Sequence, residues 1–262
     1  MIGRLRARAA RRGRRGRSLD FSDHSPEAVA QRVSAPPPVS YLRDFVYGAI
    51  DGAVTTFAIV AGAIGASLGN SVIVILGTAN LLADGFSMAV SNFLGARAEG
   101  EQRARARLDE ERQIADNPEG EREEVRQIAA ATGFSGDELE NVVAVITSDR
   151  DRWVNVMMSA ELGYGTDAAS PLRAAAATFA AFIVIGSLPL AVFFWNLIGW
   201  HEVARPGAWS AALTALGFFL VGSLKARVVE TRWWAAGLET LAVGGLAAGV
   251  AFAVGLMLEG VG

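Results

Sequence analysis

The most constraining feature of this sequence is a set of five apolar stretches, each long enough to cross a lipid bilayer. A spanning helix needs about 20 residues, because each residue advances the helix by about 1.5 Å through a hydrocarbon core about 30 Å thick. With 52% hydrophobic residues and 29 glycines, the chain is predicted to be an all-α polytopic membrane protein. The five stretches lie at about 45–69, 72–95, 174–198, 208–227 and 234–258.

Polar segments divide the chain into four predicted parts. Residues 1–43 form an Arg-rich tail with a Pro-rich spacer, and 44–96 hold the first two spans, joined by a short turn around Gly69, Asn70 and Ser71. Residues 97–172 form an acidic insert, and 173–262 hold the last three spans. The insert carries seventeen acidic side chains against ten arginines in 97–173, so it cannot lie in the membrane.

The insert is predicted to be helical, because its apolar residues recur at helical spacing between recognisable breaks. Its first helix continues from the second span to about Ala115, and Asn117-Pro118 ends it. Ser135 and Glu138 have the spacing of a capping box. The other three helices are expected at about 119–132, from Ser135 to about Thr147, and from about Asp149 to Leu162.

Basic residues beside the spans predict the orientation of the chain. With five crossings, almost all of them fall on one side, and cytosolic loops are the ones enriched in Lys and Arg. We therefore expect the N-terminus and the insert in the cytosol and the C-terminus outside. The basic residues are those of the tail up to Arg43, then Arg97, Arg173, Lys225, Arg227 and Arg232, with Arg205 alone opposite. Five tryptophans fall near span ends, as in an aromatic belt: Trp195, Trp200, Trp209, Trp233 and Trp234.

The tail segment RLRARAARRGRRGR adjoins no apolar stretch, so it does not resemble a secretory signal. A polybasic tail next to a membrane domain is expected to contact anionic lipid headgroups, and no nucleic-acid partner is expected. The alanine- and arginine-rich composition, together with the lack of a targeting signal, favours a bacterial inner membrane.

The chain has no cysteine and only two histidines, His24 and His201. Any metal site must therefore use carboxylate, thioether, amide or backbone groups. The sequence also lacks the Glu-x-x-His pattern of di-iron helices and a nucleophile with a histidine base. We expect neither an enzyme nor a bound prosthetic group.

Two acids lie inside the first two spans, Asp51 and Asp84, with no Lys or Arg at comparable depth. Because an unpaired charge in hydrocarbon is costly, the expected partner is a transported cation or a proton. Asn80 and Met88 share the helical face of Asp84, and Ser87 and Asn92 are further possible ligands. The alternatives are a structural hydrogen bond for the acids and ordinary helix packing for Met88.

Acidic and thioether side chains also recur at helical spacing in the insert. Paired carboxylates on facing helices can bind divalent ions, although runs of Glu on helices are usually solvated faces. The candidate ligands are Glu110, Glu111, Glu121, Glu124, Met157, Met158 and Glu161.

Segments of the chain resemble the vacuolar iron transporter family. The resemblance runs from DGAVTTFAIVAG and NLLADGFSMAVSNFLGARAE, through EGEREEVRQIAAATGFSGDELE and RWVNVMMSAELG, to the last spans, over about residues 41–258. It implies a homodimer of five-span subunits whose first helices line an ion path. It also implies export of cytosolic Fe²⁺ or Mn²⁺ as substrate, in exchange for protons.

The resemblance assigns Asp51 and Met88 to the membrane site, and it assigns Glu110, Glu121, Glu124, Met157 and Glu161 to the insert. This sequence departs from it at Asn80, where many relatives carry a glutamate, and at Gln113, where the spacing suggests another glutamate of the insert. Asn80 cannot take up a proton, and Asp84 one turn along is the candidate replacement. The residues leave open which metal is physiological and how strictly protons are coupled. A different class remains possible, a membrane-anchored iron-binding sensor or storage protein without transport.

Overall fold

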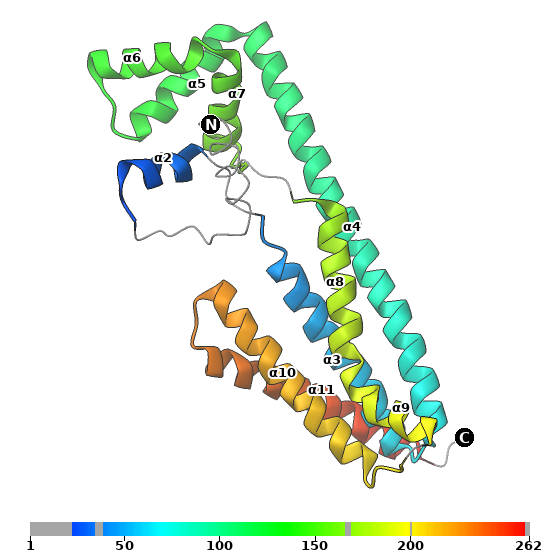
Figure 1. Ribbon diagram of the computed structural model, residues 1–262. Helices are drawn as coiled ribbons and strands as arrows, with labels where there is room; N and C mark the ends of the chain where they lie inside the picture. The colour runs from blue at the N-terminus through cyan, green and yellow to red at the C-terminus, as the bar shows by residue number, and fades with distance from the viewer. Residues whose placement is uncertain (1–22, 35–38, 166–168, 200, 260–262) are drawn as a thin grey trace, which may run out of the picture. The chain divides into compact units, whose positions relative to one another are not determined.

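The structure is a computed structural model that describes residues 23–34, 39–165, 169–199 and 201–259. The described elements are all helices, which confirms the predicted all-α fold (Figure 1). Helix α2 (Pro26–Ser34) belongs to a unit of its own, at residues 1–39, and the remaining helices form the second unit. The Arg-rich segment, the prolines at 36–38 and Trp200 lie outside the described residues.

The five predicted spans are present among the described residues as helices long and apolar enough to cross a membrane. The chain is therefore an integral membrane protein. The spans are α3 (Leu42–Gly65), the first half of α4 (Asn70–Asp116), α8 (Pro171–Gly186) with α9 (Ala191–Ile198), α10 (Pro206–Val229) and α11 (Trp233–Met257).

The turn between the first two spans lies earlier than expected. It occupies residues 66–69, and Asn70 and Ser71 already belong to the first turn of α4. Ser67 has a φ of 56°, in the left-handed region that a tight reversal requires.

The third span is broken, whereas the sequence predicted a continuous helix over 174–198. A short 3₁₀ helix, η1 (Leu188–Leu190), separates α8 from α9. Pro189 explains the break, because proline lacks an N–H and its ring clashes with the preceding turn. The carbonyl of Pro189 accepts a hydrogen bond from Ser210 Oγ of α10 at 2.6 Å, so the break is anchored to a neighbouring span.

Glycines let α3 approach two other spans closely. A Cβ on Gly52 would lie 2.6 Å from the carbonyl oxygen of Phe182 in α8. Further along α3, a Cβ on Gly62 would lie 3.3 Å from the carbonyl oxygen of Ala251 in α11. Small residues at such interfaces allow backbone contact where hydrophobicity cannot drive association. α3 is thus the central span, packed on α4, α8, α10 and α11.

The insert consists of the second half of α4 with α5 (Pro118–Ala131), α6 (Gly136–Thr147) and α7 (Arg150–Ala160). These ends agree closely with the predicted ones. Asn117 caps α5 through a bond from Gly120 N at 3.2 Å, and Asp149 caps α7 through one from Arg152 N at 2.8 Å. The helices enclose an apolar core of their own, made of Ile114, Val125, Val143, Trp153, Val154, Met157 and Met158.

The predicted capping box at α6 is wrong. Ser135 is the residue before the helix, but its side chain makes no capping hydrogen bond. The next residue, Gly136, has a φ of 58°, so the chain enters the helix through a left-handed residue. That entry differs from the extended-to-helical transition that a capping serine needs.

Candidate functional site

The two membrane acids lie together, although they belong to different spans. Asp51 of α3 and Asp84 of α4 are both half-buried and close enough to interact electrostatically. The ion pairs among the described residues involve neither of them. The backbone carbonyl of Asp51 accepts a bond from Thr55 Oγ1 at 2.9 Å. Two like charges this close favour a cation or a proton between them.

Asp51 and Met88 line one cavity of about 650 Å³ beside α3, so the structure brings together the two residues that the resemblance assigned to the membrane site. A carboxylate and a thioether on one cavity form a softer ligand set than the all-oxygen sites of Mg²⁺ or Ca²⁺. The other lining residues are Arg43, Val46, Tyr47, Ile50 and Val54 of α3, with Lys225 and Val229 of α10.

Two basic residues, Lys225 and Arg43, line the cavity that holds Asp51. Lys225 lies in the last turns of α10. Its Nζ lies 3.4 Å from Glu239 Oε2 of α11. Arg43 lies at the same cavity, with its guanidinium 5.5 Å from the ring centre of Tyr47. Both cations therefore contact groups other than Asp51, namely Glu239 and the Tyr47 ring.

The polar residues of α4 differ in their contacts: Asn80 has a free amide nitrogen among the described residues, whereas Asn92 links α4 to other helices. The Nδ2 atom of Asn80 is buried and makes no hydrogen bond among the described residues, so it is available to a ligand or water. Asn92 instead donates to Asp44 Oδ1 at 2.9 Å and to Thr178 Oγ1 at 2.7 Å, which ties α4 to α3 and α8. Ser87 is exposed. Asp44 and Thr178 were missed by the sequence reasoning, because only their contacts reveal them.

In the insert, a buried carboxylate pair joins two helices. Glu110 of α4 is 3% exposed and Glu121 of α5 is 4% exposed, and their side chains are hydrogen-bonded to each other. A bond between two carboxyl groups requires a proton on one of them. Each residue also keeps one buried oxygen, Oε1 of Glu110 and Oε2 of Glu121, without a partner among the described residues. These orphaned acceptors fit a cation.

Two exposed acids complete this carboxylate cluster, which we define as Glu110, Glu121, Glu124 and Glu161. Burial raises the pKa of Glu110 to about 8, helped by the bond to Glu121 and by the charges of Glu121, Glu161 and Glu124. Burial also raises the pKa of Glu121 and of Glu161, and both feel the charge of Glu124. The cluster therefore holds negative charge that a divalent ion would relieve.

The four side chains of the carboxylate cluster lie near one another, but they do not form a ready coordination site. Among the described residues, no three His, Asp or Glu side chains have the spacing of a ready metal site. Glu124 and Glu161 are exposed, and only Glu110 and Glu121 are in direct contact.

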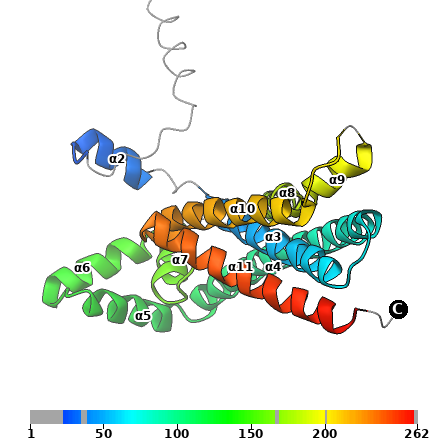
Figure 2. The ribbon, with the colours of Figure 1, turned by 90° about the horizontal axis from the view of Figure 1, so that it is seen from below.

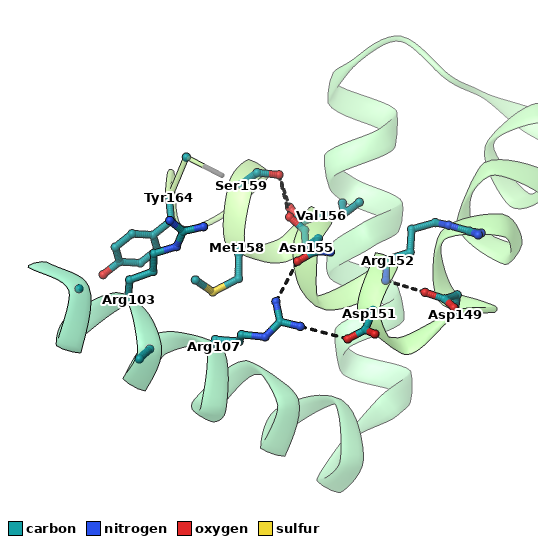
Figure 3. A pocket seen from close by; sticks show the side chains of 13 residues that line it. Arg103, Arg107, Asp149, Asp151, Arg152, Asn155, Val156, Met158, Ser159 and Tyr164 are labelled. Atoms are coloured by element: carbon teal, nitrogen blue, oxygen red, sulfur yellow. Dashed lines mark hydrogen bonds and ion pairs between the residues drawn. The ribbon is translucent and has the colours of Figure 1, made fainter. Parts of the chain in front are cut away.

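The remaining insert candidates lie elsewhere. Glu111 is paired with Arg107 at 3.1 Å, and Met157 is fully buried in the apolar core. Met158 lines a different cavity, of about 1050 Å³, between α4 and α7. Figure 3 shows Met158 beside Arg103 and Arg107, with Arg107 bonded to Asn155 at 2.8 Å and to Asp151 at 3.1 Å. Cations around that sulfur disfavour a metal ion there.

The candidate residues of both sites lie in a part of the chain that is similar to known proteins. The VIT family model matches residues 42–256, which cover the five spans and the insert. The vacuolar iron transporter of Toxoplasma gondii is 33% identical over 229 residues, covering 84% of this chain and 74% of its own. Vacuolar iron transporter 1 of Arabidopsis thaliana is 29% identical over 221 residues, covering 83% and 86%. The vacuolar iron transporter of Plasmodium falciparum is 25% identical over 224 residues, covering 83% and 82%.

Proposed function

Because this chain belongs to the VIT family, we propose that it exports divalent metal ions from the cytosol, Fe²⁺ first and Mn²⁺ as a second substrate, in exchange for protons. Iron is proposed as the substrate because the relatives are named vacuolar iron transporters. The observation that carries the proposal is the acid pair Asp51 and Asp84, which makes no ion pair with any described basic residue, and whose Asp51 lines a cavity together with Met88.

Capture of the metal begins at the carboxylate cluster. A divalent ion replaces the proton held between Glu110 and Glu121 and occupies their two orphaned oxygens. Glu124 and Glu161 then move inward, because the ion removes the repulsion that keeps them apart. Metal binding thus releases a proton in the insert.

The ion then passes to the membrane site. Asp51 and Asp84 neutralise its charge, and the Met88 thioether favours Fe²⁺ or Mn²⁺ over harder ions. When the ion leaves, the acids would be uncompensated in a medium of low dielectric constant, so a proton from the outer side takes its place. Asn80 cannot carry that proton, and Asp84 serves instead.

A second copy of the chain completes the path. The Asp51 cavity is lined mainly by one face of α3, and the proposed homodimer places two such faces against each other. We place the N-terminus and the insert in the cytosol, the C-terminus outside, and the protein in a bacterial inner membrane. The Arg-rich tail contacts anionic headgroups there.

Proton flux in proteoliposomes tests this mechanism. Addition of Fe²⁺ or Mn²⁺ to liposomes that contain wild-type protein and a pH-sensitive dye should drive proton movement. Asp51→Asn should abolish it, because the amide neither balances a divalent charge nor takes up a proton. Ser87→Ala, an exposed position on α4, is the matched control and should keep the wild-type flux. Equal flux in Asp51→Asn and wild type would remove Asp51 from the mechanism.

The rival is a membrane-anchored iron-binding sensor or store. It is favoured by the position of the carboxylate cluster, whose four residues all lie in the insert. It predicts metal binding to the purified protein with no metal accumulation in vesicles, and the same liposomes distinguish the two.

A further inference from the structure

α10 and α11 meet at their shared turn (Figure 2). A separate cavity of about 540 Å³ is lined by residues of both helices and of this turn. The lining of the cavity is apolar on one side and basic and aromatic at one end. Leu220 and Leu224 of α10 form an apolar side, and Arg227, Thr231, Arg232 and Trp233 form the end nearest the turn. An apolar wall that ends in basic and aromatic groups matches a phospholipid, with its acyl chain on one side and its headgroup on the other.

The two arginines are free to bind an anion. Both are exposed, and neither takes part in an ion pair or hydrogen bond with another described residue. This contrasts with Lys225 on the same helix, which is held by Glu239. Guanidinium groups suit phosphate because their planar donors bind two oxygens at once.

Trp233 lines the end of the cavity nearest the turn, and its ring is packed against a neighbouring side chain. Its ring packs edge-on against Phe219, with ring centres 6.0 Å apart and planes at 80°. The ring is nevertheless exposed, as expected for tryptophan at the level of lipid headgroups. Arg232, the residue before the 25-residue helix α11, makes no side-chain cap.

We propose that this cavity binds one anionic glycerophospholipid, with its phosphate on Arg227 and Arg232 and an acyl chain along Leu220 and Leu224. The site is distinct from the proposed metal path. Lys225 and Val229 line the Asp51 cavity, whereas Leu220, Leu224 and Arg227 lie on the other side of α10. The lipid-site proposal can therefore be tested independently of metal transport.

Lipid retention by the purified full-length protein tests the proposal. Native mass spectrometry after exchange into mixed phosphatidylglycerol and phosphatidylcholine should show one retained phosphatidylglycerol per chain. Arg227→Gln and Arg232→Gln should each weaken retention roughly fivefold, since one basic group near an anionic headgroup contributes about 1 kcal/mol. Arg173→Gln is the matched control, because Arg173 is exposed, belongs to the same basic set and lies outside the cavity. Arg227→Lys and Arg232→Lys should restore part of the preference.

A measurement without substitution keeps the test independent of folding defects. A phosphatidylglycerol with a photoactivatable acyl chain should label peptides that contain Leu220 and Leu224 in the wild-type protein. Equal loss of retention in Arg173→Gln would overturn the proposal in favour of diffuse charge attraction. Labelling elsewhere, or displacement of the lipid by inorganic phosphate or glycerophosphate at the same concentration, would also overturn it.

Discussion

Adjacent residues in the insert have opposite environments, and this decides which of them can bind metal. Glu110 is buried against Glu121, whereas its neighbour Glu111 pairs with Arg107 at 3.1 Å. A helix turns by about 100° per residue, so neighbours face different partners. Glu110 and Glu111 are the same residue type at adjacent positions, so substituting each in turn tests the effect of environment alone.

Glu110→Gln should weaken Mn²⁺ binding by more than about tenfold, because it removes a buried ligand charge from the carboxylate cluster. Glu111→Gln should leave the affinity near that of wild type. Isothermal titration of Mn²⁺ into the detergent-solubilised protein measures both. A larger loss in Glu111→Gln than in Glu110→Gln would contradict the assignment.

The pKa of Glu110, raised to about 8 from 4.5, makes the metal-free insert sensitive to pH. A raised folded pKa gives stability that is fully present below 4.5 and is lost as the pH rises through about 8. With a chelator present, amides of α4 and α5 around the pair should exchange hydrogen more readily at pH 8.5 than at pH 6, after correction for intrinsic rates. Glu110→Gln should flatten this dependence.

The control for that experiment is Glu140→Gln. Arg126 lowers the pKa of Glu140, so the stability that this acid contributes is lost only as the pH falls well below 6. Its replacement should leave the difference between pH 6 and pH 8.5 unchanged. Equal protection of wild type at the two values would count against a proton shared by Glu110 and Glu121.

At the level of elements, contact between α3 and α8 depends on glycine. The Cβ of Gly52→Ala would lie 2.6 Å from the carbonyl oxygen of Phe182, so the two helices would have to separate. We expect a loss of about 1–3 kcal/mol, seen as a lower Tm in detergent. Gly95→Ala in α4 meets no atom within 4 Å and should not lower the Tm. A similar Tm for Gly52→Ala and wild type would show that this interface is loose.

At the level of the whole molecule, the proposed homodimer predicts which faces of two copies meet. The chain has no cysteine, so single cysteines report proximity cleanly. Tyr47→Cys, at an exposed position on the Asp51 cavity, should form a disulfide between copies in membranes under oxidation. Val250→Cys, equally exposed on α11, should stay monomeric on a non-reducing gel. Cross-linking through Val250→Cys alone would place the interface elsewhere.

The sequence by itself determined the features that depend on local pattern. Five spans and the helices of the insert follow from hydrophobic length, helical periodicity and residues such as Asn117 and Pro118, because these act over a few turns of chain. The presence of Asp51 and Asp84 in hydrocarbon is equally visible, since depth along a span can be counted. Pro189 was also visible, although its break in the third span was not predicted.

Only the tertiary structure decided which side chains share a site. It brought Glu110, Glu121, Glu124 and Glu161 within electrostatic reach of one another, paired Glu111 with Arg107, and placed Met158 among arginines. It also tied Asn92 to Asp44 and brought Lys225 to the Asp51 cavity. The physical reason is that burial and charge at a site depend on the rotation and packing of helices far apart in the chain, which no local spacing encodes.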